Sequence, residues 1–371
     1  MRATDRYFSP DYQTAGKRFR EAVAACSGRL DSLKLSATGP AREDLAIDIG
    51  WFGTPNPQRV LVHSCGVHGV EGFAGAAIQL QWLNEGIAAL PADAAVVLVH
   101  MLNPYGAAWL RRVNENNVDL NRNFGWPRRV HDDAAAREYA ALDALLNPQS
   151  PPRADFFYAR AVWLVCRHGM KKLRDTVIGG QTVNARGLFF AEVKLEPGPA
   201  AYQDYLGARL VQTERVVAID VHSGFGRYGE DTLMVDAAPN RALVNESMQK
   251  CFGARIQLSD AGDAAYRVDG TQQDMYSSLL PGARVHFATQ EFGTLHPLRV
   301  LAALRAENRW HHFGAGAWEH ATRRHLRAVF CPADQGWREN VLRRGRDVIH
   351  QALELAFLPD TAGKLTAGNV S

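Results

Sequence analysis

Four apolar runs, each stopped by a polar residue or a glycine, constrain the fold of this chain more than any other feature of its sequence. They cover residues 59–64, 94–102, 216–222 and 283–289. The first run is followed by residues 72–85, in which apolar side chains recur at helical spacing. Strands that alternate with helices are typical of an α/β domain. We therefore predict an α/β fold with a mixed, mostly parallel twisted sheet and helices on both faces.

The alternation breaks between about residues 125 and 199, where a charged helical stretch, a Pro-Pro pair and a glycine-rich segment follow one another. We interpret this stretch as an insertion that covers the candidate active-site face within a single domain of residues 1–371. The alternative is that the Pro-Pro pair marks a linker. A helical C-terminal segment is expected at about residues 300–358. Within it, the basic stretches 318–326 and 337–346 are typical of exposed amphipathic helices.

Composition limits the class of partner. A chain of 371 residues with 46% hydrophobic residues can bury a sizeable core, and its formal net charge of +3 predicts no nucleic-acid partner. No apolar run approaches the roughly 18 residues that span a membrane. The N-terminus has no apolar signal segment, so we expect a cytoplasmic protein with no membrane partner. The five scattered cysteines lack a CxxC pair, which fits a reducing compartment and argues against a thiolate zinc site.

Polar side chains gather at the ends of the predicted strands, which is where open α/β sheets bind ligands. His68 and Glu71 follow the first run, His222 ends the third, and Glu291 follows the fourth. Two imidazoles and one carboxylate are the ligand set of a catalytic zinc ion that keeps a fourth position for water. The sequence therefore predicts one Zn²⁺ ion held by His68, Glu71 and His222. Glu291, from a separate strand end, is left to act as the general base.

Five motifs resemble those of the M14 zinc carboxypeptidase superfamily and, within it, the DUF2817 group. They are His68-Gly-Val-Glu71, Asn103-Pro-Tyr-Gly106, the segment 112–124, Asp220-Val-His-Ser223 and Gln290-Glu-Phe-Gly293. They occur in the family's order across about residues 59–293, and the stretch 118–124 is the most specific of them. This chain differs from typical members in the longer gap between Glu71 and His222, which contains the insertion.

The resemblance implies roles for further residues. Arg112 corresponds to the arginine that polarises the scissile carbonyl, and the adjacent Arg111 is the alternative. Asn121 and Arg122 correspond to the pair that binds the terminal carboxylate of the substrate. Asp119 corresponds to a carboxylate that orients a ligand histidine.

Other candidate residues have alternatives that the sequence leaves open. Tyr266 lies where the family has a mobile tyrosine that covers the substrate, and an ordinary loop aromatic is the alternative. Asp220 is either a second orienting carboxylate or a buried, hydrogen-bonded residue without a catalytic role. His63 and Cys65 are nearby rivals to the predicted ligands, but alternation along the strand assigns His63 to packing, and Cys65 is expected in the core.

Together these expectations describe a zinc metallohydrolase that cleaves an amide bond in a small substrate bearing a carboxylate. Carboxypeptidase-type cleavage of a small peptide is the first expectation. An N-acyl amino acid deacylase, like aspartoacylase and succinylglutamate desuccinylase, is the second, and a roof formed by the insertion would favour it. A non-catalytic binding module on the same fold is the third, and the loss of one ligand would indicate it.

Overall fold

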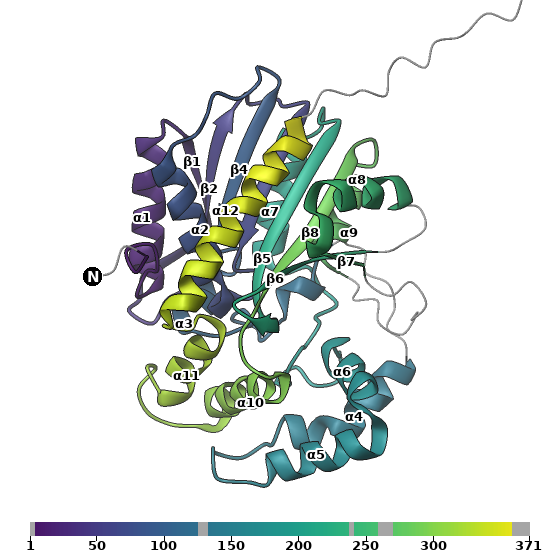
Figure 1. Ribbon diagram of the computed structural model, residues 1–371. Coiled ribbons are helices and arrows are strands. Elements are labelled where there is room, and N and C mark those ends of the chain that lie inside the picture. The colour runs from purple at the N-terminus through teal and green to yellow at the C-terminus, as the bar shows by residue number, and fades with distance from the viewer. Residues whose placement is uncertain (1–3, 125–132, 237–240, 259–269, 358–371) are drawn as a thin grey trace, which may run out of the picture.

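A single eight-stranded sheet forms the centre of the computed structural model, which describes residues 4–124, 133–236, 241–258 and 270–357 (Figure 1). The strand order across the sheet is β1-β2-β4-β3-β5-β8-β6-β7. The strands are β1 (Arg29–Thr38), β2 (Asp44–Gly53), β3 (Arg59–Cys65), β4 (Ala94–His100), β5 (Arg215–Tyr228), β6 (Asp231–Val235), β7 (Ile256–Leu258) and β8 (Arg284–Gly293).

The central strands β4, β3, β5 and β8 run parallel to one another, whereas the pairs β1–β2, β2–β4 and β6–β8 are antiparallel. This arrangement confirms the predicted mixed, mostly parallel sheet. Strand β4 pairs with one edge of β3. Strand β5, which comes later in the sequence, pairs with the other edge. The carboxyl ends of β3 and β5 therefore form the topological switch point at which such sheets bind ligands.

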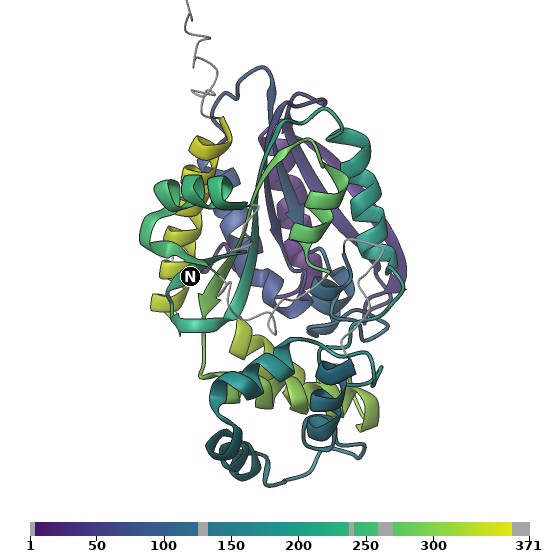
Figure 2. The same cartoon turned by 90° about the vertical axis from the view of Figure 1, so that its right-hand side faces the viewer.

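Helices cover both faces of the sheet, as predicted (Figures 1 and 2). One face packs against α1 (Tyr12–Ala25), α2 (Gly72–Glu85), α8 (Ala242–Phe252) and α12 (Gln335–Phe357). The other face packs against α7 (Pro197–Arg209) and α9 (Gln272–Leu279). Helix α2 has the bounds that its apolar spacing predicts.

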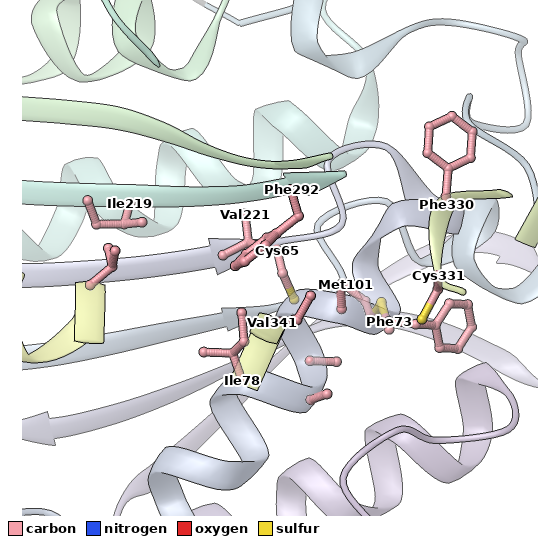
Figure 3. Close-up of a cluster of buried hydrophobic side chains, with 14 of the residues drawn as sticks. Cys65, Phe73, Ile78, Met101, Ile219, Val221, Phe292, Phe330, Cys331 and Val341 are labelled. Carbon is pink, nitrogen blue, oxygen red and sulfur yellow. The ribbon is translucent and has the colours of Figure 1, made fainter. Parts of the chain in front are cut away.

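Strand β5 separates two hydrophobic cores because successive side chains of a strand point to opposite faces. Val217, Ile219 and Val221 belong to the core under α2 and α12, and Val216 and Ala218 belong to the core under α7 and α9. Figure 3 shows the first of these cores, in which side chains of α2 and α12 pack against the strands. Burial on both faces explains why the central strands are apolar throughout.

Below the sheet, the helices of residues 133–178 lie beside α10 (Pro297–Phe313) (Figure 1). They are α4 (Asp133–Leu146), α5 (Phe157–His168) and α6 (Met170–Ile178). Short elements complete the fold, namely η1 (Gly69–Glu71), α3 (Pro104–Trp109), η2 (Leu120–Arg122), η4 (Gly253–Arg255) and α11 (Ala321–Phe330). That the chain is one domain with an insertion stays a prediction.

The expectation that residues 318–326 and 337–346 form exposed helices was wrong in part. Trp337 is buried on α12, and its indole N–H donates a hydrogen bond to the carbonyl of Gly293 at 2.9 Å. Arg323 is buried on α11, where its guanidinium lies 3.4 Å from Glu307. Both helices are amphipathic. One side of α12 packs against the sheet, and one side of α11 packs against α10. Of the helices in the described ranges, none combines the length and apolar character needed to cross a bilayer.

Candidate active site

The turn after β3 carries two of the predicted metal ligands. His68 precedes η1, and Glu71 ends it. Gly69 between them has a structural reason, because a Cβ there would lie 2.1 Å from the backbone carbon of Gly106 and 2.2 Å from the nitrogen of Ala107. Only glycine allows the turn to approach α3 this closely. The sequence therefore fixes this turn against α3, and His68 and Glu71 point into the same space.

The third predicted ligand comes from the neighbouring strand. His222 lies in the middle of β5, one residue before the continuous parallel register with β8 ends, and it pairs in register with Glu291 of β8. Residues in register on adjacent strands present their side chains on the same face of the sheet. The sheet therefore brings His222 and Glu291 together, although 68 positions separate them in the sequence.

His68, Glu71 and His222 converge on one point. Nδ1 of His68 lies 3.1 Å from one carboxylate oxygen of Glu71, and Nδ1 of His222 lies 3.5 Å from the other. The candidate ligand atoms of the three residues all lie within 4.8 Å of one another, and the three side chains are at most 4% exposed. Among the described residues, no other group of His, Cys, Asp or Glu side chains has this arrangement.

Each of the two imidazoles also contacts a buried carboxylate through its Nε2, the ring nitrogen opposite the one that faces Glu71. Nε2 of His68 lies 3.0 Å from Asp119, and Nε2 of His222 lies 2.6 Å from Asp220. At His222 a carboxylate at Nε2 keeps the proton on that nitrogen and leaves the Nδ1 lone pair for a cation. At His68 the carboxylate acts in the same way, although Nη2 of Arg112 also lies 2.8 Å from Nε2. The hydroxyl of Ser64 donates a hydrogen bond to Asp220 at 2.6 Å and fixes this carboxylate in turn. Both aspartates therefore act on the site through the histidines.

The charges of the site suit a divalent cation. Burial lowers the pKa of His222, but Asp220 and Glu71 outweigh it and raise that pKa well above its usual value. Burial raises the pKa of Asp119, but Arg122, Arg112 and His68 hold it well below the usual range, so this carboxyl is ionised. The same negative charge that stabilises a protonated imidazole also attracts a metal ion.

The donor set also fits zinc in particular. Two imidazole nitrogens and one carboxylate match a catalytic zinc site with an open position. Nδ1 of His68 is buried, and it makes no well-directed hydrogen bond among the described residues, although an oxygen of Glu71 lies 3.1 Å away. A buried polar atom without a partner is costly, and coordination to a cation would satisfy it.

Glu291 lies beside this group and is held by the backbone. The N–H of Phe225 donates a hydrogen bond to its Oε1 at 2.9 Å. Burial raises the pKa of Glu291 to about 7, and the nearby charge of Glu71 acts in the same direction, whereas His222 opposes them. A carboxyl with a pKa near neutrality can both accept and return a proton.

The two neighbouring arginines have different surroundings. Arg112 lies at the site, where its Nη1 donates a hydrogen bond to Glu71 at 2.7 Å and its Nε donates one to Asp119 at 3.2 Å. Arg111 points away into the protein and is fully buried against Glu307 at 3.0 Å. Of the two arginines, only Arg112 lies beside the candidate ligands.

Asn121 and Arg122 both belong to the short helix η2. The backbone N–H of Asn121 donates a hydrogen bond to Asp119 at 3.2 Å. The guanidinium of Arg122 contacts Asp119 and the carbonyl oxygen of Ile178, and its side chain is only 3% exposed. Arg122 therefore lies against protein groups, so a substrate carboxylate would have to compete with Asp119 for it.

Residues 178–191, which lie within the stretch 125–199 that the sequence predicts to cover the active-site face, cover the arginines. The ring of Phe189 lies 5.2 Å from the guanidinium carbon of Arg112 and 5.3 Å from that of Arg122. A Cβ at Gly180 would lie 2.6 Å from the side chain of Arg122, so this segment approaches closely. The backbone of Asp119 also donates a hydrogen bond to the carbonyl of Phe190 at 2.8 Å. No motif in the sequence marks Phe189 as part of a site.

Three candidate residues remain. Tyr266 falls outside the described residues. His63 is buried on β3, and its Nδ1 lies 3.4 Å from the amide nitrogen of Gln79. Cys65 belongs to the hydrophobic core, as its position predicts.

The chain matches one protein family by its sequence. The sequence profile of the family described as "Protein of unknown function (DUF2817)" matches residues 8–344. No curated protein matches the sequence.

The fold is similar to that of several solved structures. For carboxypeptidase A from Helicoverpa armigera, the identity is 12% over 93% of this chain and 73% of that chain, with a TM-score of 0.48. For bovine thrombin-activatable fibrinolysis inhibitor, it is 12% over 91% and 99%, with a TM-score of 0.45. For murein-tripeptide amidase from Escherichia coli O157, it is 17% over 76% and 92%, with a TM-score of 0.36.

Proposed function

The chain belongs to the DUF2817 family, and we propose that it is a zinc-dependent hydrolase that cleaves an amide bond in a small substrate bearing a carboxylate. One observation carries this proposal. Nδ1 of His68 and Nδ1 of His222 face the two oxygens of Glu71, while a carboxylate holds each Nε2. Such carboxylate–histidine pairs are the usual support of a zinc site.

His68, Glu71 and His222 would hold the ion. Zinc supplies a water of lowered pKa and polarises the scissile carbonyl when it is bound. Glu291 accepts the proton of the attacking water and later returns it to the leaving amine. Its buried position and its bond to the N–H of Phe225 keep the carboxylate aimed at the site.

Arg112 would stabilise the negative charge that develops on the carbonyl oxygen. Its guanidinium already lies beside Glu71, and its side chain is 14% exposed, more than the neighbouring ligands. Fixed donors aimed at developing charge contribute strongly when water is excluded. Asn121 and Arg122 would bind the carboxylate of the substrate, and Tyr266 would cover it. Asp119 would orient His68 throughout.

The first candidate reaction is carboxypeptidase-type cleavage of a short peptide. The second is deacylation of an N-acyl amino acid, and the cover of residues 178–191 favours it. Phe189 and the carbonyl of Ile178 occupy the side of the site next to Arg122, which leaves little room for a long peptide. All three predicted ligands and the base are present, so nothing favours a binding module without catalysis.

Metal content and activity test the proposal together. The purified chain should contain about one zinc ion. His222→Ala should remove most of this zinc, whereas His350→Ala, at an exposed position on α12, should leave it unchanged. Chelation should abolish hydrolysis, and added zinc should restore it.

The substrate class requires a panel of C-terminal dipeptides, murein-type peptides and N-acyl amino acids. We expect the smaller substrates to be cleaved faster than longer peptides because residues 178–191 cover the site. A folded wild-type chain that binds zinc no more tightly than His222→Ala would contradict the proposal. Hydrolysis that persists without metal would contradict it as well.

A further inference from the structure

Helix α5 carries an apolar surface that faces solvent. Of the thirteen exposed large apolar side chains in the described ranges, five lie between residues 156 and 170. They are Phe156, Tyr158, Val162, Trp163 and Met170. Phe156 is 82% exposed and Trp163 is 58% exposed. Side chains of this size are seldom so exposed unless they contact another molecule.

The fold does not need these side chains. The opposite side of α5 attaches the helix, since Phe157 and Ala161 pack with Leu145 in a small separate core. The guanidinium carbon of Arg305, from α10, lies 4.9 Å from the ring of Phe157. Helix α5 lies at the lower edge of the molecule, away from the sheet (Figure 1).

The same surface is basic, although Lys171 and Arg174 pair with Asp175 and Lys172 pairs with Glu138 of α4. Residues 153–175 contain six Lys and Arg against two Asp, so this segment alone has a formal charge of +4, compared with +3 for the whole chain. One of the acids, Asp155, faces inward and pairs with Arg305 at 2.6 Å and Arg309 at 3.2 Å. Arg160 and Arg167 are exposed next to the apolar side chains, and the guanidinium carbon of Arg167 lies 5.3 Å from the ring of Trp163. The partner of this surface must therefore be both apolar and negatively charged.

We propose that α5 and the start of α6 dock this protein on the surface of an anionic lipid bilayer. A helix with Trp and Phe on its outward side and basic residues beside them lies in the interface of a membrane, where the aromatic rings enter the headgroup region. The basic side chains bind the anionic headgroups. A second copy of the chain fits this surface poorly, because it would bring two segments of charge +4 together.

This docking replaces the expectation of no membrane partner. That expectation rested on the absence of a membrane-spanning run, which does not bear on a helix that lies flat on the surface. The proposal is independent of the proposed hydrolase activity and of the metal.

Vesicle co-sedimentation of the full chain tests the proposal. Vesicles of phosphatidylcholine with about a quarter phosphatidylserine should bind the protein, and pure phosphatidylcholine vesicles should bind it much more weakly. Added salt should weaken the binding. The double variant Arg160→Glu with Arg167→Glu should lower the partition coefficient by at least about 25-fold, since each basic residue contributes about fivefold. Trp163→Ser should also weaken binding.

Matched controls separate this effect from net charge and general hydrophobicity. Lys34→Glu with Arg343→Glu makes the same change in charge at exposed positions elsewhere, and Leu243→Ser removes an apolar side chain that is 83% exposed. Both should bind vesicles like the wild type. Circular dichroism should show that every variant is folded.

Four results would overturn the proposal. One is the absence of any preference for anionic vesicles, and another is an equal loss in the charge control. The third is a dimer in solution that Trp163→Ser converts to a monomer while the wild type ignores vesicles, because a second copy would then cover the surface. Retention by an acidic protein column without vesicle binding would likewise assign the surface to a protein partner.

Discussion

Replacing Glu291 with glutamine should abolish hydrolysis and, at the same time, stabilise the metal-free protein above neutral pH. The amide keeps the shape of the side chain and can still accept the hydrogen bond from the N–H of Phe225. It cannot accept a proton from water, so we expect a loss of about 10²- to 10⁴-fold in kcat. The zinc content should stay the same, because Glu291 is outside the ligand set.

The size of the stability effect follows from the pKa of this carboxyl. Its pKa is about 7 in the folded chain and 4.5 ordinarily, a difference of roughly 3 kcal/mol. Because the folded value is the higher one, the contribution of the protonated carboxyl to stability is complete below pH 4.5 and is lost as the pH rises through 7. Glutamine does not ionise, so the variant loses no stability from this position as the pH rises over the same range.

Urea denaturation of the chelated wild type and of Glu291→Gln would measure this difference. At about pH 4.5 the two free energies of unfolding should agree, and at about pH 8 the variant should be more stable by up to roughly 3 kcal/mol. Added zinc should reduce the difference, since a nearby cation lowers the pKa of the carboxyl.

A stability difference that does not change with pH would refute the reasoning about the buried carboxyl. Full activity in Glu291→Gln would refute its role as the base. The two readouts are separate, so one can fail without the other. Loss of zinc in this variant would show instead that Glu291 is itself a ligand.

Four other changes have distinct expected outcomes. Asp119→Asn should weaken zinc binding about 10- to 100-fold, measured by competition with a chelator, because the ligand imidazole loses its orienting charge. Arg111→Ala should lower the free energy of unfolding by about 3–5 kcal/mol, since it leaves Glu307 buried without this partner. Arg112→Ala should instead lower kcat by at least about 10²-fold with a smaller loss of stability, and steady-state kinetics with urea denaturation would distinguish the two. Gly69→Ala should destabilise the chain by about 3 kcal/mol or more, seen as a lower Tm, because the backbone of α3 cannot move aside.

Local patterns in the sequence were sufficient to predict the central sheet and the ligand-bearing turns. Four apolar runs predicted β3, β4, β5 and β8, because strands buried on both faces must be apolar throughout. The polar residues that stop these runs then identified His68, Glu71, His222 and Glu291, which the sheet brings together. A parallel sheet places the carboxyl ends of its strands at one edge, so local signals alone indicate a shared site.

The outer strands escaped prediction because their pattern is weaker. Strand β1 alternates between exposed and half-buried positions and has no continuous apolar run. Its pairing with β2 depends on a long-range register that no short motif encodes.

Tertiary structure alone decided which residues of the predicted insertion cover the site and which neighbours share it. The sequence assigned the catalytic arginine to Arg112 with Arg111 as the alternative, and the backbone turns Arg111 toward Glu307 and Arg112 toward Glu71. Phe189 reaches the arginines only because the chain returns across the site about 70 residues after them. The exposed face of α5 is determined by packing, because Phe157 takes the inward position. Amphipathic spacing shows that a helix has two sides, but only packing determines which side is buried.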